Sequence, residues 1–318
     1  MTLSSAVRGA QEALGSTGDV QRAADTGTPR FELFHAANSI CSQKVRTVLA
    51  HHGQAYASHT VKLFLGQTYL PAYVRLRMIG CQQFGGALVS HHSGSTSAIA
   101  GGCDGPVVPT LVDWQTEQVI VDSRRICVHL DEQLPEASRL RPLESAAAID
   151  EQLAIVDNLP NYQMLMGRKP GASESEATKD KTGGNFSQKK VAWCDQYLQE
   201  AGDEPGLVAA YTAKRAKELS AANTLFSPQA MNLAYGKVDS GLKNLEIMLA
   251  HRDGAWLFGH GLSMADLFWG IELLRLANMG VGIYGEDAKL PHVARFVAAI
   301  EALPSIREAI IDWPGALF

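Results

Sequence analysis

The chain has 318 residues, of which 46% are hydrophobic, and its formal net charge is −5. This length predicts two hydrophobic cores and therefore two domains. The sequence has no basic patch with interleaved aromatic residues, and no apolar run approaches the roughly 20 residues of a membrane span. We therefore expect neither nucleic acid nor a membrane as a partner.

Residues 1–30 are rich in Ala, Gly, Thr and Ser. They lack the apolar core of about 7–15 residues that a secretory signal has, and we predict a disordered tail. The five cysteines are an odd number scattered over a long chain, which suits a reducing compartment better than a disulfide framework. These features favour a cytoplasmic protein.

The next part of the chain alternates strand-like and helix-like patterns, which predicts a small mixed sheet flanked by helices. The strand candidates are Phe31–His35, Ala55–Leu63, Val107–Val112 and Val119–Val121. The helix candidates run from near Ser39 to Gly53 and from the cap residue Asp122 to Leu134. The order of elements is that of a compact α/β domain.

A Gly/Ser/His-rich stretch at about 80–105 interrupts this pattern. Its glycine pairs cannot hold a regular element, so we interpret it as a surface insertion. It holds His91 and His92 between Cys81 and Cys103, which raises the possibility of zinc. These spacings match no compact ligand pattern and the context supplies no rigid frame, so no metal site is predicted.

A boundary is expected near Pro135–Pro142, and strand signals almost vanish from Leu143 onward. One helix start is well specified, because Ser263 and Asp266 have the spacing of a reciprocal capping box. Helical patterns occur at about 144–166, 187–222, 226–252, 263–279 and 290–311.

Cys41 is the first candidate for chemistry, since it falls in the first turn of its predicted helix. Unpaired amides and the helix dipole at that position favour a thiolate. The alternative is a small core residue on the apolar stripe of the helix. Position 44 is Lys rather than a second cysteine, so any disulfide cycle needs an external thiol.

Four further positions allow two interpretations each. Ser39 is either an ordinary N-cap or a hydroxyl donor to a bound thiolate. Pro109 is either an edge-strand proline or a cis proline that exposes the Val108 backbone to an extended peptide ligand. Asp122 and Ser123 open a helix, either as a simple cap or as a clamp for a carboxylate.

These motifs resemble the glutathione S-transferase superfamily over about residues 31–312. The Ser39–Arg46 segment is similar to its zeta-like branch and, within that branch, to hydroquinone reductive dehalogenases. The segments that share this similarity are Tyr73–Arg77, Trp256–Gly259, Ala265–Trp269 and Ile310–Gly315.

The resemblance implies an α/β thioredoxin-like N-terminal domain at 31–135, with the insertion at about 80–105, and an all-α C-terminal domain at 143–312. It also implies a homodimer that uses glutathione as cosubstrate and acts on a small aromatic or hydrophobic substrate. Trp269 and Tyr162 are candidates for the lining of the substrate pocket.

Within this resemblance, the Val108 backbone beside cis-Pro109 would pair with extended glutathione, and Asp122 and Ser123 would meet its γ-glutamyl end. Ser39 would steady the glutathione thiolate.

The implied reaction is reductive dehalogenation through a glutathionyl thioether and a mixed disulfide on Cys41. Two alternatives remain open. One is a glutathione-dependent β-aryl etherase or cis–trans isomerase, in which Cys41 is not consumed. The other is a non-catalytic glutathione-binding stress protein.

Overall fold

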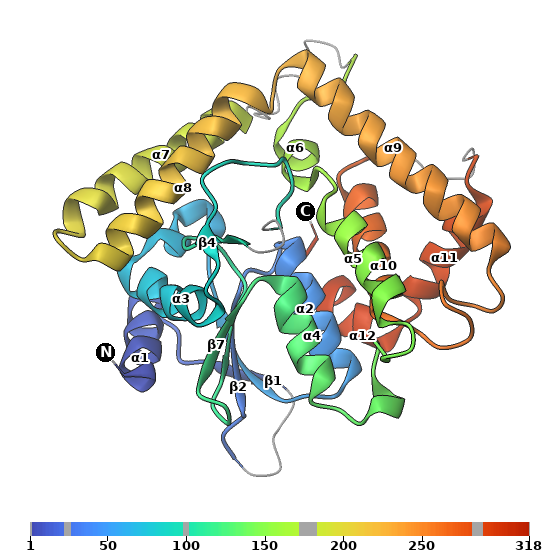
Figure 1. The fold of residues 1–318 in the computed structure, drawn as a ribbon, viewed down its shortest axis with the longest axis horizontal. Helices are drawn as coiled ribbons and strands as arrows, with labels where there is room; N and C mark the ends of the chain where they lie inside the picture. Colours follow the sequence, from blue (N-terminus) through green and yellow to red (C-terminus); the bar gives the residue numbers. More distant parts are fainter. Residues whose placement is uncertain (1, 22–26, 98–101, 172–182, 282–288, 318) are drawn as a thin grey trace.

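The computed structural model describes residues 2–21, 27–97, 102–171, 183–281 and 289–317 (Figure 1). A small sheet with helices on both faces forms the first part, and helices form the second. The prediction of an α/β domain followed by an all-α domain is confirmed. Over these residues, no helix is both long enough and apolar enough to span a bilayer.

Five strands form the sheet in the order β1-β3-β2-β6-β7, in which only the β2–β3 pair is parallel. Successive side chains of a strand point to opposite faces, so Leu33 and Leu111 join one core while Phe34 and Val112 join the other. The strands are β1 (Asp19–Gln21), β2 (Phe31–His35), β3 (Tyr56–Thr60), β6 (Thr110–Asp113) and β7 (Gln118–Val121).

Helices cover both faces of this sheet (Figure 1). On the first face lie α2 (Ile40–His51) and α4 (Ser123–Glu132), whose apolar residues belong to the core of Leu33. On the other face lies α3 (Pro71–Phe84), with α1 (Leu3–Leu14) packed outside it.

The prediction of a disordered tail over residues 1–30 is wrong for the part that the structure describes. Residues 3–14 form α1 and residues 19–21 form β1, which pairs with β3. Ala6, Val7 and Leu14 lie on one buried face of α1. The composition of this segment does not indicate a helix, because its small residues form only a narrow apolar stripe. That stripe is buried when α1 packs against α3.

The insertion also differs from the prediction. Its first residues belong to α3, which ends at Phe84 before a left-handed Gly85. Gly80 allows this helix to lie against the sheet, because a Cβ there would come within 2.6 Å of the Val119 carbonyl oxygen. The insertion also holds the short parallel strands β4 (Ala87–Leu88) and β5 (Gly102–Cys103).

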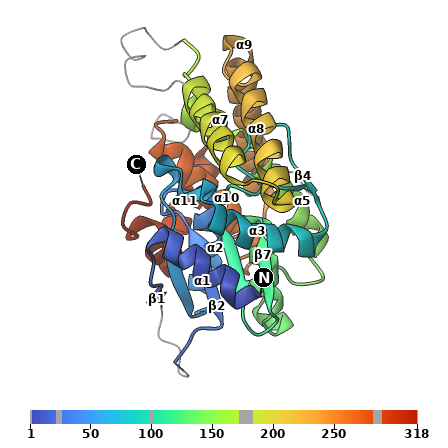
Figure 2. The ribbon, with the colours of Figure 1, turned by 90° about the vertical axis from the view of Figure 1, so that its left-hand side faces the viewer.

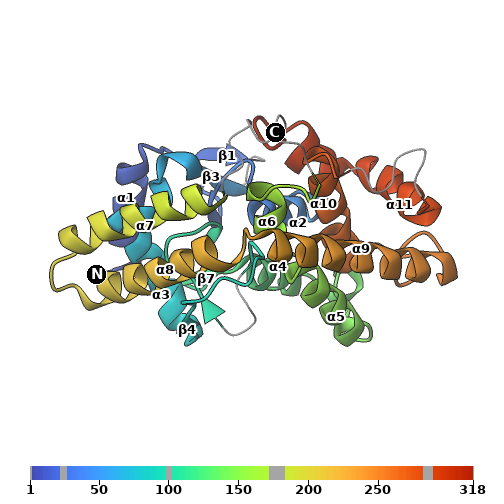
Figure 3. The same ribbon diagram turned by 90° about the horizontal axis from the view of Figure 1, so that it is seen from above.

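The described residues after Val121 contain helices and no strand. Two of the expected long helices are each divided, one before Asn161 and one between 200 and 205. In Figure 2 the α7–α8 hairpin and α9 rise above the sheet, and Figure 3 shows α8 and α9 following one another across the molecule. The helices are α5 (Ala146–Asp157), α6 (Asn161–Met166), α7 (Gly183–Glu200), α8 (Pro205–Thr224), α9 (Pro228–His251), α10 (Met264–Asn278), α11 (Pro291–Glu301) and α12 (Pro304–Ile306), with a π turn at Arg307–Ile311.

The capping box that starts α10 is confirmed and allows a stability prediction. Ser263 Oγ accepts the Asp266 amide at 3.3 Å, and the Asp266 carboxylate accepts the Ser263 and Leu257 amides, each at 2.8 Å. Replacing Ser263 by alanine should lower the free energy of unfolding by about 1 kcal/mol. Replacing Asp266 by alanine should cost roughly 2–4 kcal/mol, because two buried amides lose their acceptor. Denaturant titration of both variants measures the difference, and equal losses would contradict it.

Candidate active site

Cys41 lies in the first turn of α2, immediately after Ser39 and Ile40, as predicted. Ser39 is the N-cap, and its Oγ accepts the Ser42 amide at 3.3 Å. The Cys41 side chain is buried within the core and also borders two cavities. The two interpretations of Cys41 therefore do not exclude each other.

Part of the insertion covers the Cys41 thiol. Its Sγ lies 3.6 Å from the Thr96 carbonyl oxygen and 3.7 Å from Ser97 Oγ. Ser97 Oγ donates to Asp157 Oδ1 at 3.2 Å, and buried Lys44 Nζ meets the same oxygen at 2.6 Å. Lys44, which stands three residues after Cys41 where a dithiol motif would have its second cysteine, thus links α2 to α5 beside the thiol.

Four further site candidates, Val108, Pro109, Asp122 and Ser123, line one small cavity together with Cys41. Ser39 does not line it and instead lines a second, larger pocket. The Val108–Pro109 peptide bond is cis, as predicted. Asp122 has φ 77°, a conformation that non-glycine residues rarely adopt, while its Oδ1 accepts the Arg124 amide at 3.2 Å. Ser123 Oγ is buried and meets no hydrogen-bond partner among the described residues. Such a hydroxyl is suited to a ligand in the cavity.

Helix α3 holds the segment that leads to this cis proline. Tyr73 Oη donates to the Val107 carbonyl at 2.7 Å. Arg77 Nε donates to the Asp104 carbonyl at 2.7 Å, and Arg77 Nη1 donates to the Pro109 carbonyl. The sequence indicates these residues only through the family resemblance, whereas the fold shows that they position the loop.

A larger pocket opens between Cys41 and the α7–α8 hairpin. Tyr162 lines it as expected. Trp269 does not: it is buried in the helical core, where its Nε1 donates to Gln152 Oε1 at 3.0 Å. Aromatic side chains form much of the wall: Phe64, Tyr69, Tyr162, Phe186 and Trp193.

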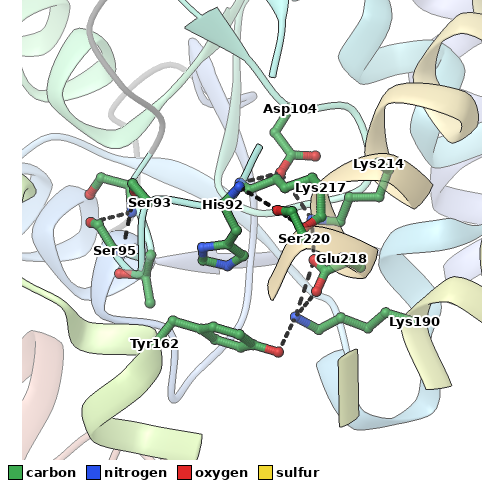
Figure 4. Close-up of polar contacts among 12 residues, drawn as sticks. His92, Ser93, Ser95, Asp104, Tyr162, Lys190, Lys214, Lys217, Glu218 and Ser220 are labelled. Atoms are coloured by element: carbon green, nitrogen blue, oxygen red, sulfur yellow. Dashed lines mark hydrogen bonds and ion pairs between the residues drawn. The ribbon is translucent and has the colours of Figure 1, made fainter. Parts of the chain in front are cut away.

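Five charged residues, here called the lysine cluster, lie together beside this pocket (Figure 4). Lys190, Lys214, Lys217 and Glu218 line the pocket, and Asp104 lines the small cavity. Lys214 and Lys217 meet Asp104 Oδ2 at 2.9 and 2.8 Å. Glu218 meets Lys214 at 3.0 Å and Lys190 at 3.2 Å. The cluster therefore joins α7, α8 and the end of the insertion.

Burial and mutual attraction both act on these groups. Burial by itself raises the pKa of Asp104. Lys214 and Lys217 have the larger opposite effect, and together they hold this pKa well below its ordinary value. Burial raises the pKa of Glu218, yet Lys190 and Lys214 bring it down to about 2. For Lys190 burial prevails over Glu218, and its pKa is lowered. Both carboxylates are therefore ionised at neutral pH.

His91 and His92 do not combine with Cys81 and Cys103 into a ligand set. The His92 ring stacks on the Tyr162 ring, with centroids 4.5 Å apart. Burial, together with nearby Lys217, lowers the pKa of His92 to about 2. In the part of the chain that the structure describes, no group of three or more His, Cys, Asp or Glu side chains could hold a metal ion.

The family model described as the glutathione S-transferase N-terminal domain matches residues 38–133, and the model of the C-terminal domain matches 220–310. Two curated relatives from Sphingobium indicum strains, each described as a 2,5-dichlorohydroquinone reductive dechlorinase, are 33% identical over 293 residues. The match covers 91% of this chain and 85% of each relative. The chain belongs to the glutathione S-transferase family.

Solved structures share the fold of this glutathione S-transferase. A beta-etherase, LigF, from Sphingobium sp. strain SYK-6 superposes with a TM-score of 0.55 at 18% identity, covering 88% of this chain and 98% of that one. A glutathione S-transferase of Methylobacillus flagellatus, solved with glutathione bound, gives 0.51 at 16% identity, covering 88% and 98%. At such identities the likeness establishes the fold alone.

The lysine cluster is the part of the site of this glutathione S-transferase that the sequence did not indicate. Lys214, Lys217 and Glu218 have spacings of three and four residues, which place them on one face of α8. That spacing usually marks an exposed charged face. Here the face is buried and pairs with Asp104, more than a hundred residues earlier, and with Lys190 of α7.

Proposed function

We propose that this protein is a glutathione-dependent reductive dehalogenase of a halogenated hydroquinone or a related aromatic compound. The observation that carries the proposal is the position of Cys41. The cysteine lies in the first turn of α2, where it borders both the small cavity and the larger, aromatic-lined pocket. The match to two reductive dechlorinases over 91% of the chain supports the same reaction.

In this proposal glutathione lies extended along the segment before β6. Its cysteinyl backbone pairs with Val108 beside cis-Pro109. Its γ-glutamyl group meets Asp122 and the Ser123 hydroxyl, which has no hydrogen-bond partner among the described residues. The Ser39 hydroxyl, which accepts the Ser42 amide, retains its proton to donate to the glutathione thiolate.

The reaction then proceeds in three balanced steps. The glutathione thiolate attacks the halogenated carbon of a quinoid tautomer, so that a C–S bond forms and halide leaves. The Cys41 thiolate attacks the glutathione sulfur, which forms an S–S bond, while the ring carbon takes the electron pair and a proton. A second glutathione thiolate resolves the mixed disulfide and releases Cys41 and oxidised glutathione. Two glutathione molecules are thus oxidised for each halide replaced by hydrogen.

A product screen tests the proposal. The purified protein is incubated with glutathione and 2,5-dichlorohydroquinone, an aryl ether or a cis-dienoate, and products are identified by mass spectrometry. We expect chloride, a dechlorinated hydroquinone and oxidised glutathione. Ether cleavage or isomerisation without a protein adduct would establish the alternative enzyme classes, and no product at all would leave a glutathione-binding protein.

Ser39 gives a prediction about the first step. Ser39→Ala should slow thioether formation by about 10- to 100-fold, because the thiolate loses a hydrogen bond worth roughly 1.5–3 kcal/mol. The variant also loses its N-cap, so its melting temperature is measured alongside. Ser39→Thr keeps both the hydroxyl and the cap and should restore the rate. If alanine and threonine are equally fast, the hydroxyl does not act on the thiolate.

We also propose a homodimer in the cytoplasm. Dimers are the expectation from the family resemblance, and light scattering tests for a species of twice 34.3 kDa. All five cysteines are free, which suits a reducing compartment.

A further inference from the structure

The larger pocket is lined by groups of different chemistry. Ser39 and Cys41 line it from the start of α2, and Lys190 lines it from α7. The Lys190 ammonium lies 4.2 Å from the centroid of the Tyr162 ring and 3.1 Å from its Oη (Figure 4). It also lies 4.9 Å from the centroid of the Phe186 ring. A flat, largely apolar molecule in this pocket would therefore have both a thiol and an ammonium group within the same lining.

The lysine cluster holds an excess of one positive charge. It has three ammonium groups, of Lys190, Lys214 and Lys217, and two carboxylates, of Asp104 and Glu218. Asp104 forms ion pairs with Lys214 and Lys217, and Glu218 forms ion pairs with Lys214 and Lys190. Among the described residues, no other carboxylate forms an ion pair with these lysines. A largely buried charge that lacks full compensation is costly. The pKa of Lys190 is lowered, because burial disfavours its charged form and Glu218 only partly offsets that effect.

We propose that this pocket binds its aromatic substrate as the phenolate anion, with the oxygen received by Lys190 Nζ and Tyr162 Oη. The proposal rests on the proposed function and specifies the ionisation state that the site selects. A phenolate oxygen beside Lys190 would supply the compensating charge, while the aromatic wall would pack on the ring.

The chemistry of halogenated phenols fits this site. Halogens withdraw electron density and lower the pKa of a phenol, so a larger fraction is ionised near neutral pH than for a group such as tyrosine, with a pKa of about 10. An ammonium group in a low-dielectric pocket favours an anion over its neutral form. A neutral aryl ether of the same shape would gain the packing but not the charge pairing.

Five groups around Lys190 in the described part of the chain do not change charge over the range in which such a phenol ionises. From α8, Lys214 keeps a raised pKa, because Asp104 and Glu218 outweigh burial, and Glu218 has a pKa of about 2. Ser187 of α7 does not ionise in this range, and burial raises the pKa of Tyr162 of α6. From the insertion, the pKa of His92 is about 2. Below the pKa of Lys190, the phenol itself is therefore the group whose titration changes binding.

The test uses 2,6-dichlorophenol and its O-methyl ether, 2,6-dichloroanisole, as probes. Binding to the full protein is measured by calorimetry without glutathione, so that no turnover is needed. We expect the phenol to bind more tightly as pH rises through its own pKa, while the ether binds with the same affinity throughout. In Lys190→Met the phenol should bind at least about 10-fold more weakly at high pH, with the ether unaffected.

A matched control is Lys243→Met, which removes the same formal charge from an exposed pair with Asp239 on α9. It should leave both affinities unchanged. Tyr162→Phe should weaken the phenol less than Lys190→Met does, because the ammonium group remains.

Three results would overturn the proposal. One is equal affinity for the phenol and the ether at all pH values, and another is an equal loss of both in Lys190→Met. The third is a loss of glutathione affinity in Lys190→Met as large as the loss for the phenol, which would assign the excess charge to a glutathione carboxylate. Because binding is measured without turnover, a negative product screen and the absence of a preference for the phenolate are distinguishable results.

Discussion

Replacing Cys41 by serine is expected to stop the reaction after halide displacement, with a glutathionyl–aromatic thioether accumulating instead of the dechlorinated product. The first step uses the glutathione thiolate and leaves Cys41 untouched, whereas the second requires a thiolate that serine cannot supply. Formation of the final product should fall by at least about 1,000-fold, since a serine hydroxyl stays protonated at neutral pH. Quantifying thioether and product by mass spectrometry in single-turnover reactions measures both steps.

The control for the Cys41 variant is Cys127→Ser, which removes a thiol from the core beneath α4, where it is fully buried. It should lose some stability but retain the normal product. Intact-mass analysis adds a second readout, because only protein with Cys41 should carry a glutathione adduct. If Cys41→Ser forms the final product at the normal rate, the cysteine is only a core residue, and an etherase or isomerase mechanism replaces the dehalogenase.

Replacing Asp104 by asparagine is expected to lower the free energy of unfolding by about 3–5 kcal/mol. The substitution keeps the shape of the side chain but leaves Lys214 and Lys217 buried, with Glu218 as the remaining carboxylate of the cluster. Urea denaturation at neutral pH measures the change. Asp239→Asn is the matched control, since its partner Lys243 is exposed and such pairs contribute at most about 1 kcal/mol.

The pH dependence of this loss follows from the sign of the pKa shift. The two lysines hold the pKa of folded Asp104 below its unfolded value of about 3.9. The stabilisation is therefore fully present above the unfolded pKa and is lost as pH falls toward the folded one. The difference between wild type and Asp104→Asn should be constant at pH 6–8 and should narrow in acid. If Asp104→Asn costs no more than Asp239→Asn, the lysine cluster does not act as a buried electrostatic unit.

Where local sequence was sufficient, the reason is that the interactions are local. Ser39 caps α2 through an amide three residues away, and the Ser263–Asp266 box closes within one turn. Asp122 likewise caps the start of α4. The cis bond before Pro109 depends on its fold context, so the local residues alone leave it open and the family resemblance is needed to predict it.

Local patterns failed where a segment owes its structure to a distant partner. The stripe of small residues on α1 has value only against α3, and β1 exists because β3 offers an edge. The insertion reads as a surface loop, yet Thr96 and Ser97 cover the Cys41 thiol, because Ser97 also bonds to Asp157 of α5. Trp269, expected in the pocket, is instead buried against α5.

The sequence by itself determined the fold class, the helix that presents Cys41 and the segments that flank the small cavity. Only the tertiary structure decided what surrounds the pocket. Charged residues on a helix have the same spacing whether water or protein covers them, so Lys214, Lys217 and Glu218 gave no sign of burial. Asp104 and Lys190 reach them from other elements. The excess positive charge of the lysine cluster arises only on folding, because the cluster is assembled from three segments that no local pattern connects.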